Sequence, residues 1–209
     1  IIGEYAYVAN GFEGLKIVNK SNPSSIYEIG NLNCVGNIVS VDIISEYAYI
    51  VLREGGLYGL KIINVSDPTT PFIIGHYSNI GNHPSDITIF DSIAYITDEY
   101  DGLYIFDISN PVFPNLISLF SITASNCVDL SGDFAYITNQ YGLTIINISN
   151  PYSPFEVGYI DLQGATCGVK ILDDHAYVAA QCQGLCILDI VDPANPLLLS
   201  SCNTPDRKS

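Results

Sequence analysis

Three turns of the chain carry the Asn-x-Ser sequence that can accept an N-linked glycan. Their asparagines are Asn19, Asn64 and Asn147, each followed two residues later by a serine. In a secreted protein such sites would place sugars on surface loops. The competing interpretation is that each asparagine holds a turn in the place of an aspartate. We favour the turn, because so short a motif arises readily by chance.

A second group of candidate ligands is acidic. Asp98, Glu99 and Asp101 follow one another closely before a glycine, and carboxylate oxygens on a turn are the ligands that Ca²⁺ prefers. The cluster occurs only once and lacks the spacing of an EF-hand loop, so a solvated acidic turn is the better interpretation. We therefore expect no metal and no cofactor.

Catalysis finds little support in the residue pattern. The histidines are His76, His83 and His175, which occupy no equivalent positions, and the Gly-x-Ser-x-Gly elbow of many hydrolases is missing from the sequence. We expect isolated surface histidines, no catalytic residue and no enzyme. The alternative is a hydrolase or lyase acting on carbohydrate, because the distances between acid, base and nucleophile are set only in three dimensions.

Six cysteines leave two interpretations open. An even count in a secreted chain permits disulfides, but these cysteines do not recur in register, and buried free thiols would act as small apolar groups. Cys182 and Cys186 flank a tight turn and are the pair best placed for a disulfide. The cysteines lie at positions 34, 127, 167, 182, 186 and 202.

Composition narrows the class of protein and its partners. Apolar residues make up 48% of the 209 residues and charged residues 14%, which is typical of a globular chain with a sizeable core. The formal charge of −15 repels phosphate backbones and anionic lipids. We therefore expect neither nucleic-acid binding nor membrane insertion, and a protein partner or identical subunits instead.

The elements that must position these residues repeat five times. Each copy contains an Ala-Tyr pair, then Gly-Leu-x-Ile and, after a polar turn, a proline, with a period of 40–46 residues. This period, in a sequence rich in short strands, is typical of propeller blades. The glycines that open the third element are Gly14, Gly59, Gly102, Gly142 and Gly184.

The second copy shows the structure expected of each unit. Strands are predicted over 39–44, 47–51, 59–65 and 72–77, with turn residues between them. Consecutive apolar residues in the third strand require cover on both faces, which stacked sheets provide. We expect an all-β propeller of four-stranded antiparallel blades, almost without helix. The predicted domain is 1–202, in units 1–38, 39–84, 85–125, 126–166 and 167–202, followed by a polar tail at 203–209.

The Ala-Tyr-Val element, the Gly-Leu-x-Ile element and the following Asn/Asp-Pro-x-x-Pro resemble the LVIVD repeat, found in surface and secreted proteins of bacteria and archaea. The match covers all five units. Ile26 replaces the second proline of the first unit, and Val191 replaces the usual serine of the last. The resemblance implies a propeller and an extracellular or cell-surface location, and it brings no active site with it.

Two expectations concern the turns between the second and third strands. The five glycines should lie in equivalent hairpins, often at positive φ, because glycine tolerates that conformation. Tyr58, Tyr100 and Tyr141 lie in the same hairpins and should project from one rim. Loops on one rim are natural recognition surfaces, so these tyrosines mark the expected binding face.

The first unit starts inside a strand, since its first five residues align with 43–47 of the second unit. We therefore expect an incomplete first blade with an open edge, which invites pairing. Either further sequence completes the ring or identical subunits meet there. The second case would give an oligomer or a filament.

Overall fold

The computed structural model describes residues 3–53 and 58–203. Every regular element in these ranges is a β-strand, as the sequence predicts. No helix among the described residues is long and apolar enough to cross a membrane.

The strands form five antiparallel sheets, one for each repeat, which we call blades 1 to 5. Blade 1 has three strands and the other four blades have four, in simple up-and-down order. The three strands of blade 1 are β1 (Tyr5–Ala9), β2 (Leu15–Asn19) and β3 (Tyr27–Leu32). Blade 2 contains β4 (Asn37–Ile44), β5 (Tyr47–Arg53), β6 (Gly59–Asn64) and β7 (Phe72–Ser78), and blade 3 contains β8 (Pro84–Phe90), β9 (Ile93–Asp98), β10 (Gly102–Asp107) and β11 (Asn115–Phe120). Blade 4 contains β12 (Val128–Ser131), β13 (Phe134–Thr138), β14 (Gly142–Asn147) and β15 (Phe155–Asp161), and blade 5 contains β16 (Thr166–Leu172), β17 (His175–Ala180), β18 (Gly184–Asp189) and β19 (Leu197–Cys202).

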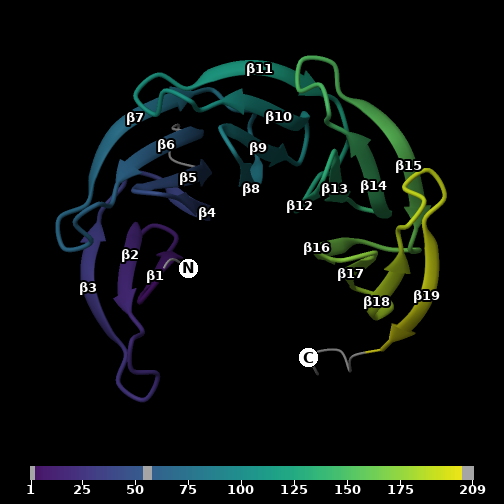
Figure 1. Cartoon of the computed structure of the whole chain (residues 1–209), viewed down its shortest axis with the longest axis horizontal. Helices are drawn as coiled ribbons and strands as arrows, with labels where there is room; N and C mark the ends of the chain where they lie inside the picture. Colours follow the sequence, from purple (N-terminus) through teal and green to yellow (C-terminus); the bar gives the residue numbers. More distant parts are fainter. Residues whose placement is uncertain (1–2, 54–57, 204–209) are drawn as a thin grey trace.

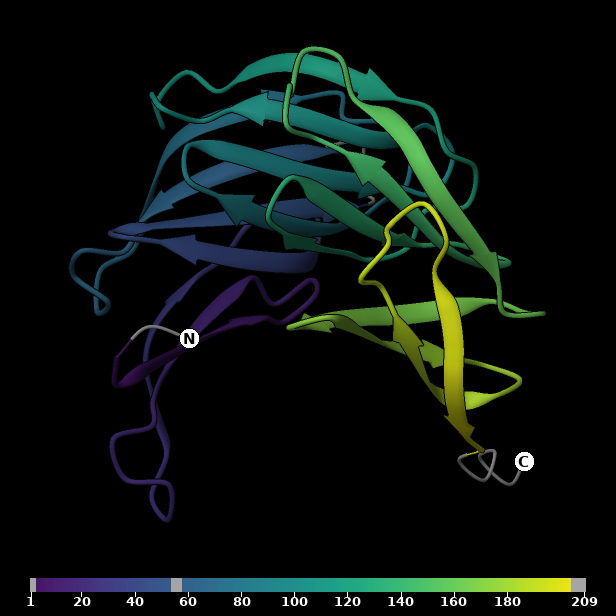
Figure 2. The ribbon, with the colours of Figure 1, turned by 45° about the vertical axis from the view of Figure 1, so that its right-hand side comes forward.

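The blades stand side by side in an open arc (Figure 1). The first strands β4, β8, β12 and β16 line the concave inner side, and the last strands β3, β7, β11, β15 and β19 form the outside. Blade 1 and blade 5 lie at the two ends of the arc, and the turned view shows the same open side between them (Figure 2). Among the described residues blade 1 has three strands, as the prediction of an incomplete first blade requires.

The hydrophobic core consists of four clusters, one at each junction between neighbouring blades. We call the face of a blade that meets the next blade its leading face, and the opposite face its trailing face. At the junction of blades 4 and 5, Leu143 and Ile145 of the leading face pack with Val178 and Leu188 of the trailing face. Ile146, the neighbour of Ile145, belongs to the other junction of blade 4. Consecutive apolar residues in one strand thus serve two different junctions, which explains their pattern.

The repeated glycines are needed for close packing more than for an unusual backbone. Gly14, Gly102 and Gly184 have φ of 90°, 112° and 73°, whereas Gly59 and Gly142 do not have positive φ. At Gly59 a Cβ atom would overlap the Tyr77 carbonyl oxygen of the outer strand, and at Gly142 it would overlap that of Ile160. The expectation of frequent positive φ holds for three of the five, and the contact with the fourth strand accounts for the rest.

The predicted sequons lie at the ends of the third strands. Asn19 Oδ1 accepts hydrogen bonds from the backbone N–H of Ser21 at 2.9 Å and from its hydroxyl at 2.6 Å. Asn64 and Asn147 bind their serines in the same way. Asp107 accepts the equivalent backbone bond from Ser109 at 2.8 Å. The turn role of these asparagines is therefore confirmed, while glycosylation at Asn19, Asn64 and Asn147 stays a prediction.

The unit boundaries stay a prediction, and positions 204–209 of the expected polar tail lie outside the described residues.

Candidate functional site

A polar cluster that does not repeat lies on the rim where the second-to-third-strand hairpins and the connections between blades meet. Arg53 ends β5, His83 precedes β8, and Glu99 follows β9, so two blades supply the three side chains. Glu99 Oε2 lies 3.2 Å from Arg53 Nη2 and 3.2 Å from His83 Nδ1. Arg53 Nη2 also bonds to His83 Nδ1. The expectation that His83 is an isolated surface histidine is wrong, because the fold brings it against residues 30 and 16 positions away.

The cluster is accessible from solvent. A guanidinium group can only donate hydrogen bonds, so Arg53 donates to the Glu99 carboxylate. The three side chains are between 29% and 38% exposed, which leaves them open to a ligand. The ring of Tyr100 meets that of His83 edge to face, with centroids 4.9 Å apart.

A fully buried carboxylate holds the loop under this cluster. Asp98 Oδ2 accepts a hydrogen bond from the backbone N–H of His83 at 2.8 Å, and its Oδ1 accepts from those of Tyr100 and Asp101 at 2.8 and 3.0 Å. The expected solvated acidic turn is therefore only partly correct, because Asp98 is buried as a turn anchor. Beside it, Tyr104 donates to Asp101 at 2.8 Å, and burial together with the nearby carboxylates raises the pKa of Tyr104. Among the described residues no group of three His, Cys, Asp or Glu could hold a metal ion.

Next to this cluster an open pocket of about 330 Å³ extends across blades 3, 4 and 5. Glu99, Gln140 and Gln181 occupy the same hairpin position in the three blades, five residues after the alanine of the Ala-Tyr pair and just beyond the second strand. Two small residues, Ala124 and Ala165, come from the connections between blades. Asn126 completes the lining.

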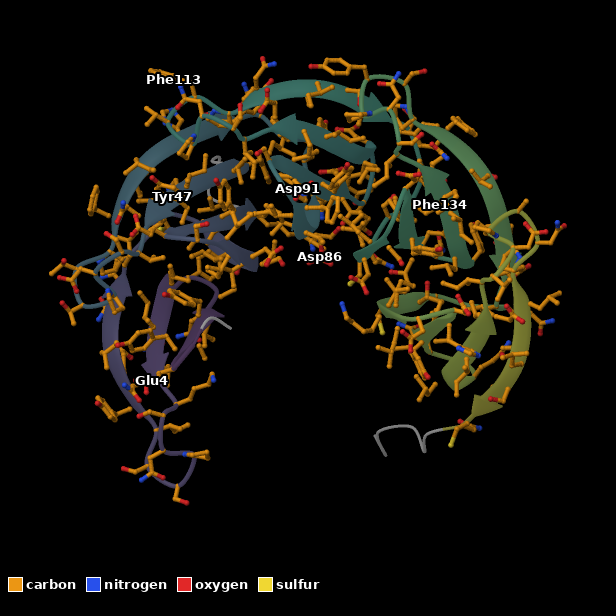
Figure 3. The ribbon with its side chains drawn as sticks, viewed as in Figure 1. Glu4, Tyr47, Asp86, Asp91, Phe113 and Phe134 are labelled. Atoms are coloured by element: carbon orange, nitrogen blue, oxygen red, sulfur yellow. The ribbon has the colours of Figure 1, made fainter. Side chains whose placement is uncertain are left out.

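The inner side of the arc carries a chain of aspartates that link neighbouring blades. Asp42 accepts a hydrogen bond from Ile89 N–H at 2.8 Å, Asp86 from Val128 N–H at 3.1 Å, and Asp129 from Ile171 N–H at 2.6 Å. Each carboxylate thereby satisfies a backbone donor on the first strand of the following blade. Asp86 faces the concave side, whereas the exposed Phe113 lies on the outer circumference (Figure 3). Burial raises the pKa of Asp86, although the hydrogen bonds from Ser40, Val128 and Ile87 oppose the shift.

Cysteines do not contribute to the rim cluster. All six carry free thiols in the structure, including Cys182 and Cys186. Cys186 is fully buried in the core between blades 4 and 5, whereas Cys182 is exposed in the turn, so the two side chains point into different environments. Burial raises the pKa of the Cys186 thiol.

The tyrosines expected on the binding rim differ in exposure. Tyr100 and Tyr141 are 60% and 57% exposed, at equivalent positions next to Glu99 and Gln140. Tyr58 is half-buried and lines a separate pocket of about 160 Å³ in blade 2. Sequence reasoning missed Arg53, Gln140 and Gln181. In the sequence, each could have been recognised as a polar residue at the end of a second strand, at a position whose residue type varies among the repeats.

Chemically, the cluster can bind and orient a ligand and can exchange protons through Glu99 and His83. The hydrogen bonds that the structure gives Glu99 and His83 include none from a serine, threonine or cysteine side chain in the described ranges.

These features define an all-β repeat protein of propeller type, with a polar site on one rim. The family model of the LVIVD repeat matches the chain five times, at residues 1–34, 35–79, 82–121, 124–161 and 163–204. The chain therefore belongs to the LVIVD repeat family. A search of the curated proteins finds no match.

Solved structures with the same fold share little sequence with this chain. A functionally unknown protein from Desulfotomaculum acetoxidans is 13% identical with a TM-score of 0.78, over 95% of this chain and 66% of that one. A protein from Lactobacillus plantarum is 13% identical with a TM-score of 0.81, over 98% and 67%. The periplasmic gluconolactonase of Pseudomonas aeruginosa is 9% identical with a TM-score of 0.80, over 98% and 70%. The chain thus spans about two thirds of the length of these proteins.

Proposed function

We propose that this domain is an extracellular or cell-surface interaction module without catalytic activity, which associates head to tail through the end faces of its blade arc. The observation that carries the proposal is that both end faces expose residues whose equivalents are completely buried elsewhere in the molecule.

The leading face of blade 5 provides the first half of this observation. Leu185 is 39% exposed. Leucines at the same position of the other four blades are 0% exposed, because the next blade covers them; they are Leu15, Leu60, Leu103 and Leu143. A pocket of about 280 Å³ on this face is lined by Leu185, Ala179 and Cys167, among others.

The trailing face of blade 1 provides the second half. Val8 is 40% exposed, whereas the residues at its position in blades 2 to 5 are 0% exposed; they are Ile50, Ile96, Ile137 and Val178. The two exposed faces are thus the two halves of a junction that the molecule already uses four times. Apolar surface that is buried at every other junction favours association when it is left open.

Blade 1 also offers a strand edge. In blades 2 to 5 the second strand pairs with a first strand on its inner side, but β1 pairs only with β2 among the described strands. An unpaired edge presents backbone donors and acceptors to another chain. Because the two end faces differ, the contact is head to tail, and a contact of this kind that does not close produces a filament.

Sedimentation velocity over a range of protein concentrations tests this proposal. The wild-type chain should sediment as multiples of 22.7 kDa that grow with concentration. Leu185→Lys should abolish the larger species. Leu119→Lys introduces the same charge at a leucine that is 44% exposed on the outer strand β11, and should leave them unchanged. A wild-type protein that sediments as one 22.7 kDa chain at every concentration would refute the proposal.

One observation favours a second candidate, a hydrolase of lactones or carbohydrates. Arg53, His83 and Glu99 form a non-repeating cluster, and one protein of similar fold is a gluconolactonase. Glu99 would act as the base for water and Arg53 would orient a carbonyl oxygen. Hydrolysis of glucono-δ-lactone above the spontaneous rate, lost in Glu99→Gln, would support this candidate. If the protein does not accelerate hydrolysis over the rate in buffer, this candidate is refuted and the non-catalytic interaction module is favoured.

A further inference from the structure

The pocket between Glu99, Gln140 and Gln181 has the lining of a ligand site. Its volume of about 330 Å³ falls within the range of about 300–1,000 Å³ that is typical of small-molecule sites. Three successive blades build it from equivalent hairpin positions, so its shape is fixed by the packing of the blades and not by one loop. We propose that it binds a neutral, polyhydroxylated ligand, such as one pyranose ring of a saccharide.

The amide groups support this class of ligand. An amide donates through its nitrogen and accepts through its oxygen, as a hydroxyl group also does. Among the described residues no hydrogen bond occupies the side-chain amide of Gln140 or Gln181. The bonds near them use backbone groups, such as Gln181 N–H to the Ala165 carbonyl at 2.9 Å. Both side chains are exposed and available to hydroxyl groups that carry donor and acceptor together.

The charge of the lining supports a neutral ligand. Glu99 is the one ionisable residue that lines the pocket, and its carboxylate is paired with Arg53 at 3.2 Å. The pair leaves little net charge to select an anion or a cation. A carboxylate held in this way still has lone pairs that can accept from a hydroxyl group.

The floor and the surroundings fit a ring-shaped ligand. Ala124 and Ala165 are small, which leaves room above the connections between blades. Tyr100 and Tyr141 follow Glu99 and Gln140 directly and are 60% and 57% exposed. Exposed tyrosine rings offer an apolar surface with a polar tip, which suits the mixed C–H and hydroxyl faces of a sugar. The inference goes beyond the proposed self-association and does not depend on it.

Nuclear magnetic resonance titration of the whole chain tests the proposal. The probes are the methyl α- and β-pyranosides of glucose, galactose and mannose, with sodium gluconate as an anionic counterpart of the same hydroxyl content. At least one pyranoside should shift the side-chain amide signals of Gln140 and Gln181 in a saturable way. Gluconate should bind more weakly than the best pyranoside.

The decisive variant is Gln181→Ala, which should weaken binding about three- to tenfold through the loss of one or two hydrogen bonds. Asn115→Ala removes an exposed amide from the start of the outer strand β11 and should not change the affinity. The proposal is overturned if no pyranoside gives saturable shifts in the millimolar range, if Gln181→Ala binds as the wild type does, or if gluconate binds more tightly than every pyranoside.

Discussion

Replacing Asp129 by alanine should loosen the junction between blades 4 and 5. Asp129 is only 8% exposed; its carboxylate accepts a hydrogen bond from Ile171 N–H at 2.6 Å and lies 2.9 Å from Lys170 Nζ. The alanine variant leaves the backbone donor of Ile171 without its acceptor. A hydrogen bond to a charged group contributes about 1.5–3 kcal/mol, and we expect a loss of stability of that size. For a chain of this length the melting temperature should fall by about 3–12 °C.

Two further variants separate the backbone bond from the ion pair. Lys170→Ala should cost less than about 1 kcal/mol, because the lysine side chain is 75% exposed and its pair with Asp129 is screened by water. Asp129→Asn keeps an oxygen acceptor for Ile171 N–H. Its loss of stability should therefore lie between those of Asp129→Ala and Lys170→Ala. Urea unfolding of the three variants measures these differences. If Asp129→Ala is no less stable than Lys170→Ala, the carboxylate does not hold the following blade and the reasoning is wrong.

Three further predictions concern junctions and titration. Gly158→Ala should destabilise by about 1–3 kcal/mol, since the new Cβ would overlap the Pro193 carbonyl oxygen of the next blade; an unchanged urea midpoint would contradict this. Ser118→Ala, at the equivalent position of blade 3, should cost about 1 kcal/mol through loss of the 2.6 Å bond from its hydroxyl to the Pro151 carbonyl, measured in the same way. Burial raises the pKa of Tyr49 from 10.0 to about 12. Its contribution to stability should therefore be complete below pH 10 and disappear as the pH rises through 12, so Tyr49→Phe should show a shallower alkaline loss in urea midpoints than the wild type.

The strands and the stacking of the blades could be predicted because they depend on local patterns. Apolar residues on both faces of the third strand, as at Ile145 and Ile146, require a sheet covered on both sides. The short turns between strands follow from glycine, asparagine and proline. For the glycines the physical reason was only partly foreseen. Gly59 and Gly142 are required by the approach of an outer strand, and a linear sequence does not show that distance.

The rim cluster could not be predicted for a related reason. Arg53 and His83 are 30 residues apart and lie in neighbouring blades, and neither residue type recurs at that position in the other repeats. A repeat predicts what its copies share, whereas this site is made of the positions at which the copies differ. Tyr100 and Tyr141 were found because they sit in the shared hairpin. Gln140 and Gln181 occupy the adjacent shared position, and only the folded arc shows that they and Glu99 line one pocket.

The chain of inner aspartates bears on how the arc can be extended. Asp42 and Asp129 occupy the same position, opposite Tyr49 and Tyr136 of the paired strand, and each accepts a backbone donor from the following blade. In blade 5 this position, opposite Tyr177, holds Lys170, whose amine turns back to Asp129. Blade 3 has Thr88 at this position, opposite Tyr95, and its Asp86 accepts the bond from Val128 N–H of the following four-stranded blade instead. A carboxylate at this position is therefore not required for a further blade to follow. The apolar leading face of blade 5 is the feature that favours a further blade as its neighbour, and head-to-tail association would provide one.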